Sequence, residues 1–114
     1  MKKLPNVHPG EILQEEFLRP LNITAYRLAK ETKIPATRVS EILKGKRSIS
    51  TDTALRLSKF FENSAEFWLG LQVEYDLRKE RLIKEKELNE IRTYNSLRVV
   101  TKFFFKKEKF DQKK

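Results

Sequence analysis

The chain has 114 residues, with 25 Lys or Arg, 16 Asp or Glu, one His and no Cys, and its formal net charge at pH 7 is +9. This length suits one small domain, and the lack of cysteine excludes a disulfide framework, a thiolate metal site and a thiol nucleophile. No segment approaches the roughly 20 apolar residues of a membrane span, and no apolar run follows Met1. We therefore expect a cytoplasmic protein that does not bind membranes.

The positive charge is concentrated in the last third of the chain. Residues 1–77 contain 12 basic and 10 acidic residues, a net of +2, whereas residues 78–114 contain 13 and 6, a net of +7. We predict a domain over residues 1–77, followed by a basic C-terminal extension over residues 78–114. Because the domain itself is only weakly charged, any nucleic-acid binding by it must depend on the side chains that one face presents.

The first helix is predicted near the N-terminus. The single histidine, His8, lies beside a predicted turn, where a capping or packing role is expected. With no cysteine and no second histidine, no metal site is expected. Residues 11–19 follow with apolar residues at helical spacing, and Pro20 is predicted to close this helix.

The centre of the sequence predicts two short helices separated by a tight turn. Thr24 can accept a hydrogen bond from the free N–H groups that begin a helix over residues 25–32. Pro35 suits the first turn of a second helix, predicted over residues 35–44, and Gly45 is expected to end it in the left-handed conformation. This arrangement is typical of a helix-turn-helix.

The outward face of the second helix is suited to reading DNA. Arg38 is the main candidate, because arginine can bond guanine O6 and N7 together, and Glu41 is predicted either to accept from cytosine or to orient Arg38. Thr37 is expected to bond a base or a phosphate, and Ala36 to pack on a thymine methyl. The predicted phosphate contacts are Thr24, Lys44, Lys46, Arg47 and Ser48. The alternative is a pair of packed helices whose outer face is merely solvated.

Two more helices are predicted after this unit. Ser50 is a good cap for a helix that continues to Phe61, and Ser64 can cap a fifth helix from Ala65. In the fifth helix we favour core packing for Phe67 and Leu71. Four further residues are expected either in the core or on a dimer surface: Trp68, Leu69, Gln72 and Tyr75.

The extension changes in character along its length. Up to about Arg92 it lacks Gly and Pro, so the fifth helix is expected to continue past the domain. The segment LRVVTKFFF beyond Ser96 is β-branched and aromatic and predicts a short strand. Three roles remain open for the extension: pairing of an extended segment with a partner protein, nonspecific nucleic-acid binding by basic and aromatic residues, or no specific role.

Four sequence blocks lie in order between His8 and Leu77: HPGEIL, RVSEILKGKR, ISTDTALRLSKFF and EFWLGLQVEYDL. In these blocks the chain resembles the HigA (VapI) type of antitoxin, a branch of the Xre, lambda-repressor-like helix-turn-helix proteins. The resemblance implies an all-α, five-helix DNA-binding domain that acts as a dimer, represses its own operon and neutralises a HigB-type toxin, a ribonuclease that cleaves messenger RNA. One residue departs from the family: Lys33 stands where the turn usually has glycine, so Lys33 must adopt a positive φ or the turn must differ.

A dimer has a consequence for the DNA site. Two recognition helices related by a two-fold axis read half-sites about 34 Å apart, so the operator is expected to be an inverted repeat. The competing interpretations are a stand-alone Xre-type regulator without a toxin partner and a protein-interaction module. An enzyme is disfavoured, since the sequence has no phosphate-binding glycine loop and no acidic cluster with metal-ligand spacing, and no cofactor is expected.

Overall fold

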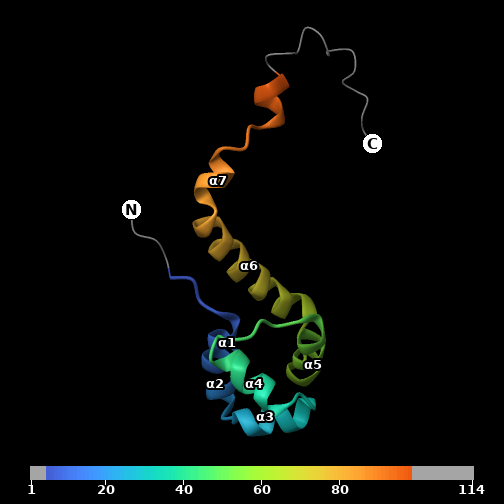
Figure 1. Cartoon of the computed structure of the whole chain (residues 1–114). Helices are drawn as coiled ribbons and strands as arrows, with labels where there is room; N and C mark the ends of the chain where they lie inside the picture. Colours follow the sequence, from blue (N-terminus) through green and yellow to red (C-terminus); the bar gives the residue numbers. More distant parts are fainter. Residues whose placement is uncertain (1–4, 99–114) are drawn as a thin grey trace. The chain divides into compact units, whose positions relative to one another are not determined.

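A computed structural model describes residues 5–98, and all regular structure in this range is helical (Figure 1). The elements are α1 (Pro9–Ile12), the π-helical turn η1 (Leu13–Leu18), α2 (Arg19–Leu21), α3 (Ala25–Thr32), α4 (Ala36–Leu43), α5 (Thr51–Phe61), α6 (Ala65–Ile83) and α7 (Glu85–Asn89). Because α1, η1 and α2 are continuous, residues 9–83 form the five predicted helices, and the all-α class is confirmed. The chain divides into two units, Met1–Glu80 and Arg81–Lys114.

The first helical stretch does not end where the sequence predicted. It passes through Pro20 and ends at Asn22, which has a left-handed φ of 58°. Proline normally collides with the carbonyl four residues earlier in an α-helix. Here the backbone N–H of Arg19 donates to the carbonyl of Gln14, five residues back, so a wider π turn leads into the proline. The prediction that Pro20 closes the helix is therefore wrong.

The starts of α3, α5 and α6 lie where capping side chains predicted them. The Oγ1 of Thr24 accepts from the N–H of Arg27 at 3.0 Å, and the Oγ of Ser64 accepts from Phe67 at 3.0 Å. Ser50 caps α5 by accepting from the N–H of Thr53 at 3.3 Å. Each cap satisfies a backbone donor that has no partner inside its helix.

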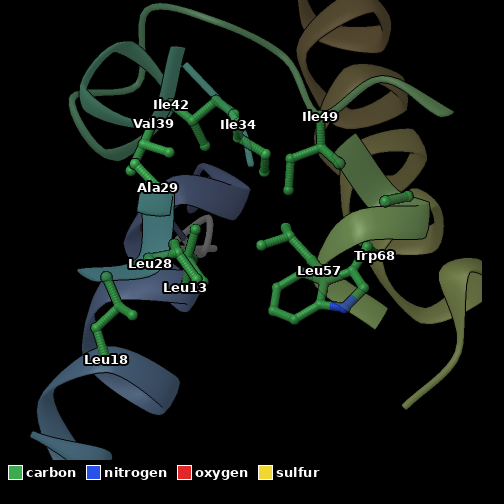
Figure 2. Close-up of a cluster of buried hydrophobic side chains, with 11 residues drawn as sticks. Leu13, Leu18, Leu28, Ala29, Ile34, Val39, Ile42, Ile49, Leu57 and Trp68 are labelled. Carbon is green, nitrogen blue, oxygen red and sulfur yellow. The ribbon is translucent and has the colours of Figure 1, made fainter. Parts of the chain in front are cut away.

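One hydrophobic core joins these helices (Figure 2). The π turn η1 and helices α3, α4, α5 and α6 contribute to it, and so do the turn before α4 and the loop after it. Its buried members are Leu13, Leu18, Leu28, Ala29, Ile34, Val39, Ile42, Ile49, Ala54, Leu57 and Trp68. The small side chain of Ala29 lies where α3 packs against α4.

The fifth helix runs past the predicted domain boundary at Leu77 to Ile83, where Lys84 interrupts it before α7. Residues 94–98 are helical, so the predicted strand is wrong at Leu97 and Arg98. Thr93 explains this difference, because its side chain accepts from the N–H of Ser96 at 3.0 Å and begins a helical turn. The rest of the predicted strand lies outside the described residues.

No helix within residues 5–98 is both long and apolar enough to cross a lipid bilayer.

Candidate nucleic-acid interface

The turn between α3 and α4 sets the direction of α4. Lys33 has φ 59° and ψ 34°, so of the two alternatives that the sequence left open it adopts the left-handed conformation, and the turn keeps its usual geometry at this residue. The N–H of the buried Ile34 then donates to the carbonyl of Ala29 at 3.1 Å. Pro35 is the N-cap of α4, so this helix begins at Ala36, one residue later than predicted. Together these residues hold α4 against α3 through the turn and the core.

The outer side of α4 presents the predicted reading face. Ala36 and Thr37 are exposed, Arg38 and Glu41 are partly buried, and Val39 and Ile42 point into the core. Beyond the helix, the basic loop, defined here as residues 44–48, is exposed throughout. The predicted base and phosphate contacts therefore form one continuous surface segment. The hydroxyl of Thr24 is exposed at the start of α3, where it already caps that helix.

Arg38 is not a free cation. Its Nη1 donates to the Oδ2 of Asp52 at 2.8 Å and to the Oγ1 of Thr53 at 3.3 Å. The same carboxylate accepts from the Nε of Arg56 at 3.0 Å, and Nη1 of Arg56 reaches the carbonyls of Thr32 at 3.2 Å and Lys33 at 3.3 Å. A chain of polar contacts thus links α4, the start of α5 and the end of α3.

The two arginines perturb the titration of Asp52. Hydrogen bonds from Arg38 and then from Arg56 hold the pKa of Asp52 below its ordinary value, because they stabilise the ionised carboxylate. Asp52 therefore stays ionised, and keeps both arginines, at any pH above the usual carboxylate range.

Glu41 pairs with the basic loop rather than with Arg38. Its Oε1 accepts from the Nε of Arg47 at 2.7 Å, while its backbone carbonyl accepts from the N–H of Lys46 at 2.8 Å. In the described structure, the alternative in which Glu41 orients Arg38 is not found, because Asp52 takes that place. α4 ends at Leu43, and Gly45 follows its C-cap with a φ of 76°, which confirms the left-handed conformation predicted for this glycine.

A buried amide anchors the far end of the basic loop. The Oε1 of Gln72 in α6 accepts from the N–H of Ile49 at 2.8 Å, and its Nε2 donates to Asp76 at 3.0 Å. Sequence reasoning missed this role of Gln72, since the two partners lie 23 positions apart. It also missed Asp52 and Arg56 as partners of the reading face, although their spacing of four on one helix signals an ion pair.

The structure divides the predicted dimer residues into two groups. Trp68 is 0% exposed, packs 4.8 Å from the ring of Phe17 and donates its indole N–H to Asn63 at 2.9 Å. Gln72 is also buried. Both belong to the interior of the protomer, so they do not offer a surface to a second copy.

The remaining two, Leu69 and Tyr75, are half-buried. The apolar side chains that α6 exposes are instead Phe67, Val73 and Leu77, at 39%, 54% and 43%, and, at its C-terminal end, Leu82 and Ile83, at 53% and 65%. The prediction that Phe67 packs in the core is therefore confirmed only in part. Its side chain is partly exposed, although its ring also contacts the rings of Phe17 and Trp68.

Within residues 5–98, no group of three or more His, Cys, Asp or Glu side chains is arranged to hold a metal ion.

Comparison with known proteins agrees with this geometry. The helix-turn-helix family profile matches residues 14–68. Virulence-associated protein I of Dichelobacter nodosus is 45% identical over 76 residues, which are 67% of this chain and 70% of that protein.

Two solved structures are similar over most of the chain. The antitoxin HigA of Pseudomonas aeruginosa, solved with the higBA promoter, has a TM-score of 0.76 at 40% identity and covers 79% of this chain and 99% of its own. The HigA-family addiction module antidote protein of Coxiella burnetii has a TM-score of 0.75 at 46% identity and covers 80% and 100%.

The fold and the α3–turn–α4 unit define a helix-turn-helix protein, which is a class of regulators and antitoxins rather than of enzymes. Within that class, the chain belongs to the HigA and VapI family. The resemblance found in the sequence is confirmed.

Proposed function

We propose that this protein is a DNA-binding antitoxin that represses its own operon. The observation that supports this proposal most directly is the outer face of α4 followed by the exposed basic loop, which presents Ala36, Thr37 and Arg38 on the same short stretch as Lys44, Lys46 and Arg47. In this proposal α4 enters the major groove, Arg38 reads a guanine, and the basic loop and Thr24 lie along the phosphates. The similarity to HigA solved with a promoter supports the same assignment.

The DNA-binding form in this proposal is a homodimer whose interface is the exposed apolar face of α6. Val73 and Leu77 are four residues apart and so lie on one side of the helix, and Phe67 lies about 120° round the helix from Val73; all three are partly exposed to solvent. Exposed apolar side chains grouped in this way favour burial against another surface. A second copy is the proposed occupant, because a two-fold dimer places two α4 helices for an inverted repeat.

The protein partner in this proposal is a HigB-type toxin. Membership of the HigA family supports it, and the alternative is a stand-alone regulator of the same fold. Co-expression with the product of the neighbouring gene separates these functions. Copurification, together with suppressed messenger RNA cleavage by that product, is expected of an antitoxin, while a regulator without a toxin would purify alone.

DNA recognition is tested with the full chain and the DNA upstream of its own gene. Binding is measured against a scrambled duplex over a range of salt concentrations. We expect a clear preference for the upstream DNA that persists as salt rises, because base contacts depend less on counterion release than phosphate contacts do. Equal and salt-sensitive binding to both duplexes would contradict the proposal.

Two substitutions separate base reading from phosphate contact. Arg38→Ala is expected to cost about 1–3 kcal/mol and to relax the preference at one base position. Lys46→Ala is expected to weaken all sequences alike and to reduce the salt slope by about one. An unchanged base preference in Arg38→Ala would remove Arg38 from the reading face.

A further inference from the structure

The position of Asp52 bears on how Arg38 can read a base. Asp52 lies in the first turn of α5, outside the reading face, yet it accepts a hydrogen bond from Nη1 of Arg38 at 2.8 Å. The Oγ1 of Thr53 accepts from the same nitrogen at 3.3 Å. Nη1 carries two hydrogens and has two acceptors here, so it has no hydrogen left to donate to a base.

The opposite edge of the guanidinium is left available. Among the described residues, neither Nε nor Nη2 of Arg38 makes a hydrogen bond. These two nitrogens present parallel N–H groups, and such a pair matches the O6 and N7 acceptors of one guanine. The contacts with α5 therefore select which edge of Arg38 is offered to DNA.

Asp52 is itself held in place from a second direction. Arg56 donates from Nε to both carboxylate oxygens at 3.0 Å and from Nη1 to the carbonyls of Thr32 and Lys33. The orientation of Arg38 is thus tied to the α3–α4 turn that positions the reading helix. Ion pairs as exposed as these contribute little to stability, so their main effect is on geometry.

We infer that Asp52 is a positioning residue that determines DNA sequence specificity, holding Arg38 by Nη1 so that its Nε–Nη2 edge meets a single guanine. This inference rests on the proposed function, in which α4 reads the operator. Asp52 itself need not touch DNA. Its loss frees the arginine to turn, and it also removes a negative charge beside the phosphates.

The test is Asp52→Asn in the full chain, with binding measured to the upstream duplex, to duplexes in which each guanine of a half-site is replaced in turn, and to a scrambled duplex. We expect the preference for guanine at the Arg38 position to fall by about fivefold or more, which is the lower limit of what a bidentate pair contributes. Binding to the scrambled duplex should stay equal or rise, because the protein becomes more positive. A purely structural role would weaken binding to all duplexes together.

The matched control is Glu15→Gln, which makes the same change of charge and also weakens the hold on an arginine, Arg19. Since neither Glu15 nor Arg19 is assigned to DNA, this variant should leave every base preference intact. Arg56→Gln provides a second route, because it releases Asp52 from the α3–α4 turn. Arg56→Gln should weaken the same guanine preference, and it tests the positioning role of Asp52 if Asp52→Asn does not fold.

The outcomes separate the inference from the function. If the wild type and Arg38→Ala show that Arg38 reads a guanine while Asp52→Asn and Arg56→Gln keep the wild-type preference, the positioning role is wrong and the proposed function stands. If the wild type itself does not distinguish the upstream duplex from the scrambled one, the proposed function fails and the inference fails with it.

Discussion

At Gly10 the backbone of α1 lies against the end of α4. A Cβ at this position would overlap the carbonyl oxygen of Ile42 and lie 2.7 Å from its carbonyl carbon. Because the obstacle is backbone, no rotamer change relieves it. We expect Gly10→Ala to lower the free energy of unfolding by about 1–3 kcal/mol, measured by chemical denaturation.

Gly70 in α6 is the matched control for Gly10, since a Cβ there meets no atom within 4 Å. Alanine favours a helix over glycine, so Gly70→Ala should raise the free energy of unfolding by about 0.5–1 kcal/mol at the same protein concentration. Equal stability of the two variants would show that α1 does not approach α4 as described.

His8 gives the protein a pH dependence at the same place. Its Nδ1 accepts from the N–H of Gly10 at 2.8 Å, which requires this nitrogen to be unprotonated. Burial lowers the pKa of His8, and it is opposed by Asp76 and reinforced by Lys79. Since the folded pKa lies below the unfolded one, the contribution of His8 to stability is complete above about pH 6.5 and is lost as the pH falls through the lowered pKa.

The corresponding measurement is thermal unfolding between about pH 7 and pH 5 for the wild type and His8→Asn. Asparagine keeps an oxygen acceptor for the cap but does not titrate, so the fall in melting temperature should be shallower in the variant. Parallel curves for the two proteins would exclude His8 as the titrating group.

At the scale of the elements, the α3–α4 turn is made by a residue poorly suited to it. Lys33 has a φ of 59°, whereas glycine occupies the left-handed position at the end of α4. The left-handed conformation destabilises a residue with a Cβ by roughly 1–2 kcal/mol. Glycine avoids this strain, but part of the gain in stability is lost because glycine has a higher conformational entropy in the unfolded chain. We expect Lys33→Gly to raise the free energy of unfolding by about 0.5–1 kcal/mol.

Lys33→Ala is the control for this turn, because it removes the long side chain but keeps the Cβ. It should remain close to the wild type in chemical denaturation. If Lys33→Ala gains as much as Lys33→Gly, the benefit comes from loss of the lysine side chain and not from relief of the backbone.

At the scale of the whole molecule, the proposed dimer makes a prediction about mass and DNA binding together. Val73 is 54% exposed on α6, and a two-fold interface would bury it on both copies. Val73→Glu then buries an unpaired carboxylate twice and should weaken dimerisation by at least about tenfold, seen by light scattering over a concentration series. Binding to the inverted repeat should weaken with it.

Leu55 on α5 is the control for the dimer, with a similar exposure of 57% on a different helix. Leu55→Glu should leave the mass unchanged. If Val73→Glu also keeps the mass of the wild type, α6 does not form the interface, and another surface must bring two copies of α4 together.

The starts of α3, α5 and α6 could be predicted from the sequence, because each depends on residues that are neighbours along the chain. Thr24, Ser50 and Ser64 each accept from an N–H three positions later, and the left-handed end at Gly45 follows from glycine itself. The outward position of Ala36, Thr37 and Arg38 could be predicted in the same way from helical spacing within α4. The prediction at Pro20 was wrong because a π turn accommodates the proline within the helix. The prediction at Leu97 was wrong because a threonine cap begins a helical turn where the residue types favoured a strand.

The sequence by itself therefore determined the capped starts of three helices, the position of the turn between α3 and α4, and the family. Tertiary structure decided the partners: Asp52 lies 14 positions from Arg38, and Gln72 lies 23 positions from Ile49. It also decided that Trp68 is buried while Val73 is exposed, on neighbouring turns of one helix. The physical reason is that local hydrogen bonds depend only on adjacent residues, whereas ion pairs and burial depend on which elements the packed core brings together.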